Sequence, residues 1–438
     1  MVQRAVMRKV VRRIVPLLCL LYLVNYVDRV NIGFAGPNGM TDELGMSATV
    51  FGLASGIFFL GYLVLEVPSN LLLQRFGARR WLARIMASWG VLVCVIAFVP
   101  NQTTLVILRF LLGIAEAGFF PGVILYLTYW FPAAYRARMV ALFMAAVPIS
   151  TVLGSTLSSL IIQGLDGWLG LTGWRVMFLV EGVPALLLAV VTWFCLTDRP
   201  EQARWLSAQE REWLSGTLLA EQNSVHNRHQ WSLRRALIHP RIIALAFVYF
   251  GIAYGLYALG FFLPTIVKGF AEQYATEYST IQTGLITAIP YVFGALLMVP
   301  WARHGDRSGE RVWHVAIPMV LGGLAIPVAL YLGSPLATMI AVTVCAVGVC
   351  AALPTFWALP SEFLTGTAAA AGLALINSLG NISGFAAPYI TGWLRDLTGT
   401  QNAGMWVVGA CMLAGAVTVV LLGAAPKKTA PTSTNTGS

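Results

Sequence analysis

The sequence predicts an all-α membrane protein with twelve transmembrane helices in two six-helix halves, and composition and length carry this prediction. Hydrophobic residues make up 58% of the 438 residues and charged residues only 11%, whereas about 25% of a soluble domain is charged. Apolar runs near 20 residues recur, and each can cross a hydrocarbon core of about 30 Å at about 1.5 Å per residue. The twelve predicted runs are 14–34, 49–70, 81–99, 104–130, 138–163, 174–196, 241–267, 280–302, 312–332, 336–360, 368–393 and 403–424.

The longest polar stretch, residues 197–240, divides the runs six and six and is predicted to be a linker. Within it, Ser207 and Glu210 have the spacing of a capping box, which predicts a short helix through Trp213 along the membrane surface. The C-terminal tail is rich in Thr, Ser, Pro and Gly, a composition typical of disorder. The predicted parts are an N-terminal half (1–196), the linker (197–240), a C-terminal half (241–424) and a disordered tail (425–438).

Basic residues alternate from loop to loop. They are concentrated before the first run, in the loops between runs 2 and 3, 4 and 5, 6 and 7, and 8 and 9, and behind the last run, whereas the other loops hold few. Because cytoplasmic loops carry the excess of Lys and Arg, both termini are predicted to be cytoplasmic, in a bacterial-type inner membrane. The net charge of +10 therefore reflects topology. The lipid bilayer is the expected partner, and nucleic acid is not.

Four ionisable side chains lie inside predicted membrane runs: Asp28 and Arg29 in the first, Arg109 and Glu116 in the fourth. A charge at the bilayer centre costs about 2.5–3.5 kcal/mol on insertion scales, so such residues usually mark a substrate or ion pathway. Arg109 and Glu116 are seven residues apart, which places them on one helix face but about 10 Å apart along its axis, too far for an ion pair.

The chemistry of these four groups indicates an anion site beside proton-carrying acids. Arginine donates two parallel hydrogen bonds to a carboxylate and keeps its charge. Hydrocarbon around a carboxyl group favours its protonated form, whereas a nearby arginine favours the ionised form. A substrate that neutralises an arginine would therefore let Asp28 hold its proton, which is a route to coupling.

A short motif recurs after the second run of each half. The segments Gln74-Arg-Phe-Gly-Ala-Arg79 and Asp306-Arg-Ser-Gly-Glu-Arg311 match, which indicates a duplication. The segment from Asn70 to Arg80 resembles the loop motif G-x-L-a-D-r-x-G-r-r of the major facilitator superfamily, except that Asn70 replaces the first Gly and Gln74 the usual Asp. The resemblance implies a gating or structural role for Gly77, Arg79, Arg80, Asp306, Arg307 and Arg311.

Further segments are similar to the anion:cation symporter family within that superfamily. They are Asn25-Tyr-Val-Asp-Arg-Val-Asn-Ile-Gly33, Glu66-Val-Pro-Ser-Asn70, Arg109-Phe-Leu-Leu-Gly-Ile-Ala-Glu-Ala-Gly118 and Phe178-Leu-Val-Glu-Gly-Val-Pro184. The family includes bacterial carriers for tartrate, phthalate, hydroxyphenylacetate, galactonate and glucarate, and the sialic acid and vesicular glutamate transporters. The resemblance, over residues 8–424, implies the major facilitator fold and import of a small organic anion by proton symport through alternating access.

The resemblance also implies roles for single residues. Positions that match Asp28 and Glu116 are proton sites, and those that match Arg29 and Arg109 bind the anion. Further substrate contacts are implied at Trp357 and Asn377 and, more loosely, at Tyr26 and Tyr62.

Two other acids receive weaker assignments. Glu181 is assigned to packing, gating or direct transport, and Glu66 is expected to pair with loop arginines near the inner end of its helix. The substrate class stays open between sugar acids, tartrate-like dicarboxylates and aromatic acids, and Na⁺ coupling is an alternative to H⁺ coupling. We expect a monomer without cofactor or metal.

Three alternatives stay open at this stage. The four charges could form only internal salt bridges that join the first and fourth helices. The same fold could export drugs or metabolites by proton antiport, although the segment 144–154 keeps only Pro148 and Gly154 of the antiporter signature G-x-x-x-G-P-x-x-G-G. A membrane enzyme or sensor is disfavoured, since the sequence has no nucleophile, metal or phosphate-binding motif and no signalling domain.

Overall fold

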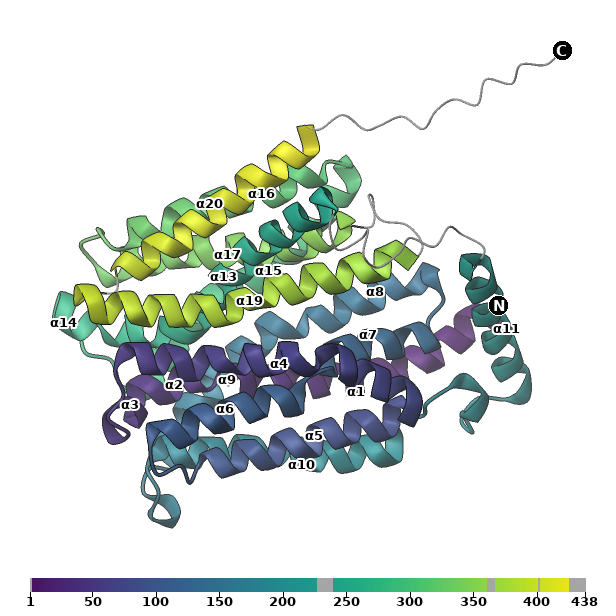
Figure 1. Cartoon of the computed structure of the whole chain (residues 1–438), viewed down its shortest axis with the longest axis horizontal. Coiled ribbons are helices and arrows are strands. Elements are labelled where there is room, and N and C mark those ends of the chain that lie inside the picture. The colour runs from purple at the N-terminus through teal and green to yellow at the C-terminus, as the bar shows by residue number, and fades with distance from the viewer. Residues whose placement is uncertain (1, 227–238, 361–366, 401, 425–438) are drawn as a thin grey trace.

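The computed structural model describes residues 2–226, 239–360, 367–400 and 402–424, which form a bundle of long, roughly aligned helices without β-strands (Figure 1). The predicted tail and the linker residues 227–238 lie outside this described part. The main helices of the predicted N-terminal half are α1 (Val2–Val30), α4 (Ala48–Phe76), α5 (Ala78–Ile96), α6 (Gln102–Glu116), α7 (Phe119–Trp130), α8 (Ala133–Met144), α9 (Ala146–Gly164) and α10 (Gly173–Cys195). Short helices α2 (Ile32–Ala35) and α3 (Met40–Glu43) connect α1 to α4.

A linker helix, α11 (Ala208–His226), leads to the second predicted half. Its helices are α13 (Pro240–Lys268), α14 (Phe270–Tyr274), α15 (Thr280–Ser308), α16 (Arg311–Ala329), α17 (Pro335–Ala358), α19 (Thr367–Thr398) and α20 (Asn402–Ala424). In the described part, ten helical segments are long and apolar enough to cross a membrane. The predicted capping box is confirmed, because Glu210 N donates to the Ser207 hydroxyl and Ser207 N donates to the Glu210 carboxylate. The helix that it begins, α11, is longer than predicted and continues well beyond Trp213.

Every predicted membrane run overlaps a helix, and three runs are interrupted, the first of them between α1 and α2 at Asn31. The fourth run divides into α6 and α7 at Ala117 and Gly118, where Gly118 has a φ of +84°. A Cβ on Gly118 would lie 2.3 Å from the hydroxyl oxygen of Ser69 on α4, so the break allows a close approach. The fifth run divides into α8 and α9 at Ala145. Hydropathy alone does not register such breaks, since the residues on both sides are apolar.

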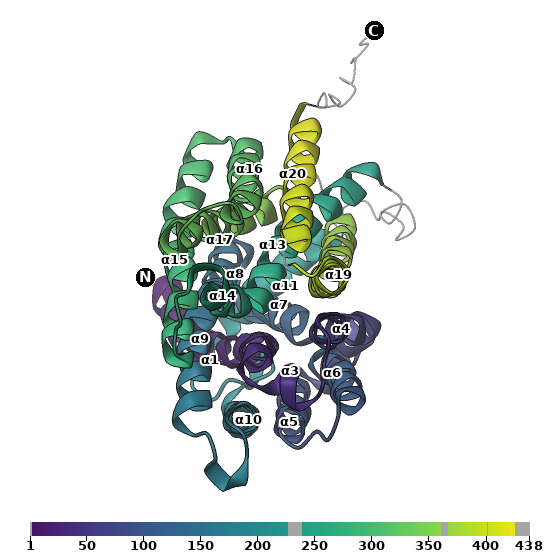
Figure 2. The same ribbon diagram turned by 90° about the vertical axis from the view of Figure 1, so that its left-hand side faces the viewer.

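The two predicted halves pack against each other chiefly through α4 with α19 and α9 with α15. Figure 2 looks along the bundle and shows most helices of the first half (purple to blue) below those of the second (green to yellow). At the end predicted to face outward, Asp396 of α19 accepts hydrogen bonds from the backbone N–H groups of Ala48 and Thr49, at 3.1 and 2.7 Å. The first turn of α4 is thus capped by the other half.

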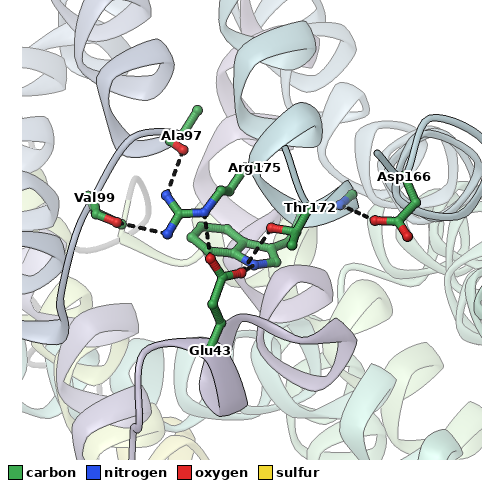
Figure 3. Close-up of polar contacts among 8 residues, drawn as sticks. Glu43, Ala97, Val99, Asp166, Thr172 and Arg175 are labelled. Carbon is green, nitrogen blue, oxygen red and sulfur yellow. Dashed lines mark hydrogen bonds and ion pairs between the residues drawn. The ribbon is translucent and has the colours of Figure 1, made fainter. Parts of the chain in front are cut away.

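A second polar network ties together the connections of the first half at the same end (Figure 3). The Arg175 guanidinium donates to the Glu43 carboxylate at 2.8 Å and to the carbonyl oxygens of Ala97 and Val99, each at 2.9 Å. Trp174 also donates to Glu43, at 2.6 Å. These contacts hold α3, the α5–α6 connection and the start of α10 as one unit.

Candidate functional site

The four predicted charges all lie inside the bundle, where α1 and α6 carry two each. Their exposed fractions are 1% for Asp28, 6% for Arg29 and 0% for both Arg109 and Glu116. Arg29 donates to Glu116 through Nε, at 3.1 Å, and through Nη2 in a closer contact. One of the predicted anion-binding arginines is therefore already paired with a carboxylate, across the α1–α6 interface.

Arg109 is held differently, by backbone carbonyls. Its Nε donates to the oxygen of Ala54 at 3.2 Å and its Nη2 to the oxygen of Arg29 at 3.5 Å, while Nη1 has no hydrogen-bond partner among the described residues. The expectation that Arg109 and Glu116 would not pair agrees with these contacts. One donor of Arg109 is thus available to a further acceptor.

One aromatic ring lies near both guanidinium groups. Their Cζ atoms lie 5.2 Å (Arg29) and 5.4 Å (Arg109) from the ring centre of Phe58 on α4. Close helix packing brings this ring in, because a Cβ on Gly113 of α6 would lie 1.9 Å from the carbonyl oxygen of Phe58. The faces of an aromatic ring favour cations, so Phe58 helps to accommodate both arginines.

Asp28 has a separate environment, although it is the sequence neighbour of Arg29. Its Oδ2 accepts a hydrogen bond from Nε1 of Trp89 on α5, at 2.8 Å. Its Oδ1, and Oε2 of Glu116, have no partner among the described residues. Each acid therefore has one buried oxygen that can carry a proton.

Further polar residues lie inside the bundle with these charges. Asn25 lies three residues before Asp28, hence on the same helix face, and neither amide atom has a partner in the described part. Glu181 accepts from Asn31 at 3.0 Å and from Ser158 at 2.7 Å. A three-residue spacing could have indicated Asn25, but no local signal indicates the partners of Glu181.

The predicted aromatic contacts lie around the arginines and in the other half. The Tyr62 ring centre lies 5.4 Å from the Arg29 guanidinium, and buried Tyr26 packs edge-on against Tyr22. Trp357 packs against Tyr249 with ring centres 4.9 Å apart, and its indole N–H has no partner among the described residues. These rings form an aromatic environment of the kind that surrounds small-molecule sites.

The hydrogen-bond partners of Glu66 differ from the expected loop arginines. Its carboxylate accepts hydrogen bonds from Asn377 at 2.9 Å and from Ser378 at 3.1 Å, both on α19, and not from the loop arginines. The reason is depth, because Glu66 lies ten residues, about 15 Å, before the end of α4. Asn377 was predicted as a substrate contact, whereas Ser378 was not predicted at all.

The repeated loop motif lies at the opposite end from the outer networks. Gly77 has a φ of +88° in the α4–α5 turn, and the backbone N–H of Arg79 donates to Asp198 at 2.7 Å. Asp306 and Arg311 of the second copy pair at 3.8 Å. The remaining motif arginines, Arg80 and Arg307, are exposed. In the described residues no group of three or more His, Cys, Asp or Glu could hold a metal ion.

Comparison with known proteins agrees with this architecture. The chain matches the Major Facilitator Superfamily over residues 18–388 and again over 245–438. A "Putative tartrate transporter" of Agrobacterium vitis is 48% identical over 98% of this chain and 94% of that protein. A "Quinolone resistance transporter" of Acinetobacter baumannii is 38% identical over 95% of this chain and 94% of that protein. A solved D-xylose-proton symporter has a TM-score of 0.73 at 18% identity, over 93% of this chain and 97% of that chain, which shows the shared fold.

The long apolar helices and the buried charges between them define a multi-pass membrane transporter, not an enzyme. The chain belongs to the Major Facilitator Superfamily. The predicted all-α fold of that superfamily is confirmed. The roles assigned to individual residues stay predictions, and the contacts above refine them.

Proposed function

We propose that this transporter imports a small organic anion across a bacterial inner membrane by proton symport. Both termini then lie in the cytoplasm, and the substrate carries at least one carboxylate. The observation that supports this most directly is the contact between Arg29 and Glu116, in which a buried arginine already binds a carboxylate.

The proposed coupling is an exchange of one carboxylate for another. A substrate carboxylate competes with Glu116 for Arg29 and gains the unpartnered Nη1 of Arg109 as a second donor. An ionised carboxylate left in the interior without its cation is strongly destabilised. Glu116 therefore binds a proton when the substrate arrives and releases it when the substrate leaves.

Asp28 is the other acid that was predicted to carry a proton, and its role in this proposal is indirect. It touches Trp89 and not an arginine, so its protonation responds to the net charge around the site and not to direct displacement. The original expectation gave the arginine competition to Asp28. The geometry supports transferring it to Glu116.

A second candidate function is efflux by proton antiport. The similarity to the protein named as a quinolone resistance transporter favours this reading. Two buried arginines favour anions over cationic drugs in either direction. Import and efflux would use the same site and differ in the direction of the proton relative to the substrate.

One experiment separates the candidates. Purified protein is placed in liposomes that trap a pH-sensitive dye, and tartrate, galactonate, glucarate, phthalate or hydroxyphenylacetate is added outside. Symport predicts internal acidification by at least one acid, absent from protein-free liposomes, whereas antiport predicts internal alkalinisation. An acid that is exchanged in counterflow but moves no proton would contradict both.

A further inference from the structure

Two donors on the second half converge on one carboxylate. Asn377 and Ser378 are consecutive residues of α19, and they bond different oxygens of Glu66: Nδ2 of Asn377 donates to Oε1 and Oγ of Ser378 donates to Oε2. Glu66 and Asn377 are only 5% and 9% exposed. A pair of donors that covers both oxygens recognises a carboxylate group, whichever molecule carries it.

The contact of Glu66 with Asn377 and Ser378 is suited to the exchange of one carboxylate for another. It joins residues 311 and 312 positions apart in the chain, one on α4 and two on α19. Both donors are uncharged, and a hydrogen bond to a charged group contributes about 1.5–3 kcal/mol. A different carboxylate offered to the same donors would restore both bonds, so replacing Glu66 costs little once Glu66 itself is neutralised.

The location relates this contact to the arginines. Glu66 follows Tyr62 by four residues, about 6 Å or one turn along α4, and the Tyr62 ring lies against Arg29. Arg29 is also the cation that acts electrostatically on the Glu66 carboxylate. The carboxylate that the donor pair holds and the Tyr62 ring that faces Arg29 therefore branch from α4 about one helical turn apart, a separation that a small molecule with two carboxylates can bridge.

We propose that Asn377 and Ser378 bind the second carboxylate of a dicarboxylate substrate, and that Glu66 is a tethered carboxylate that the substrate must displace. This inference rests on the proposed function and specifies its substrate class. The first carboxylate engages the arginines, and the second replaces Glu66 on α19. A monocarboxylate has no second group to offer, so it leaves Glu66 in place and does not link the two halves.

The test compares two ligands of similar size, tartrate and the monocarboxylate glycerate, on the full-length protein in lipid nanodiscs by calorimetry. Glu66→Gln removes the charged competitor, so the Kd for tartrate should fall about tenfold while the Kd for glycerate stays within about twofold. Ser378→Ala should raise the Kd for tartrate about tenfold, the equivalent of one hydrogen bond, again without affecting glycerate. Matched controls are Glu277→Gln, on the outer surface, and Ser88→Ala, whose hydroxyl bonds only within α5.

The outcomes are distinct. If Glu66→Gln and Ser378→Ala change the affinities for tartrate and glycerate equally, Glu66 is only a structural link and the inference is wrong, while the proposed function stands. Preference of the wild type for glycerate over tartrate would also overturn the inference alone. Failure of the wild type to bind or exchange any organic acid of the panel would overturn the proposed function and the inference together.

Discussion

Arg29 donates hydrogen bonds to the carboxylate of Glu116, whereas Asp28 bonds Trp89. The two acids that were predicted to carry protons therefore have different partners. Asp28 and Arg29 are sequence neighbours, but side chains of consecutive residues point about 100° apart on a helix. Arg29 therefore reaches Glu116 on α6, while Asp28 meets Trp89 on α5. In the proposed mechanism Glu116, and not Asp28, competes with a substrate carboxylate for Arg29. Substitution of Glu116 therefore tests the proton coupling more directly than substitution of Asp28.

Glu116→Gln should retain substrate exchange but abolish proton-driven accumulation. Glutamine can still accept a hydrogen bond from Arg29, but it cannot bind or release a proton. In proteoliposomes, counterflow should stay within about threefold of the wild type, whereas acidification driven by the substrate should disappear. Glu272→Gln, an exposed residue of α14, is the control. Loss of counterflow together with loss of folding would show that the Arg29–Glu116 pair is only a salt bridge between α1 and α6.

Arg109→Lys should weaken substrate binding and leave the fold intact. Lysine keeps the charge but has one nitrogen in place of the planar fork, so it cannot place separate nitrogens on the Ala54 carbonyl and on a substrate carboxylate. We expect the Kd of the transported anion to rise about tenfold, as for one charge-assisted hydrogen bond. Arg84→Lys is a matched control, because Arg84 stacks on Trp81 away from the site, at 4.1 Å. Unchanged affinity in Arg109→Lys would assign Arg109 a packing role.

At the scale of whole helices, the two predicted halves are joined at the end predicted to face outward, where a carboxylate of α19 caps the first turn of α4. The first N–H groups of a helix have no partner within it, and Asp396 accepts from two of them at the start of α4. Burial raises the pKa of Asp396, but hydrogen bonds from Thr49 and Ala48 outweigh it and lower the pKa below the usual aspartate value. Asp396 lies beyond the predicted span 368–393.

Asp396→Ala should shift the transporter toward an outward-open state. The carboxylate contributes about 1 kcal/mol as a helix cap, which corresponds to about a fivefold change in population. Distances between spin labels at Leu169→Cys and Tyr331→Cys, which are 68% and 69% exposed, would report the opening. Because the pKa is lowered, the contact is present above the ordinary value and is lost only as the outer pH falls below about 4. An equal effect of Glu277→Gln would contradict this role, as would label distances in Asp396→Ala that match those of the wild type.

Across the whole molecule, the sequence predicts helices and buried charged residues, but it does not predict contacts between residues that are far apart in the chain. Length and hydropathy predict twelve runs, and each overlaps a helix in the described part, because a membrane helix must satisfy its own backbone in lipid. The charged residues were also identifiable, since their cost in hydrocarbon singles them out. Their partners were not, because Arg29 and Glu116 are 87 positions apart and Glu66 and Asn377 are 311 apart. Ser378 carries no signal, since serine is common in helices that pack inside membranes.

The buried charges of the whole bundle also limit how many protons accompany the substrate. In the described part, the buried Arg, Lys, Asp and Glu side chains are two arginines, Arg29 and Arg109, and four acids, Asp28, Glu66, Glu116 and Glu181. An uncompensated charge in the interior is costly. Two of the acids must therefore be ionised when no substrate is bound, and Glu116 and Glu66, the two that a substrate would displace, are the natural pair.

A dicarboxylate should consequently move with two protons and a monocarboxylate with one. Each substrate carboxylate takes over the balancing role of one acid, which must then bind a proton for the interior to stay neutral, so the loaded and unloaded carrier have equal charge. The ratio is measured from the accumulation of tartrate and glycerate at a fixed pH gradient, with the membrane potential clamped by potassium and valinomycin. At a gradient of one pH unit, accumulation should approach about 100-fold for tartrate and about tenfold for glycerate, because each proton contributes about 1.4 kcal/mol. Imposing a potential should change neither value, since no net charge crosses. If the accumulation of tartrate responds to the membrane potential, the charge of one arginine is not compensated while the carrier reorients. The burial of both guanidinium groups makes such a state unfavourable.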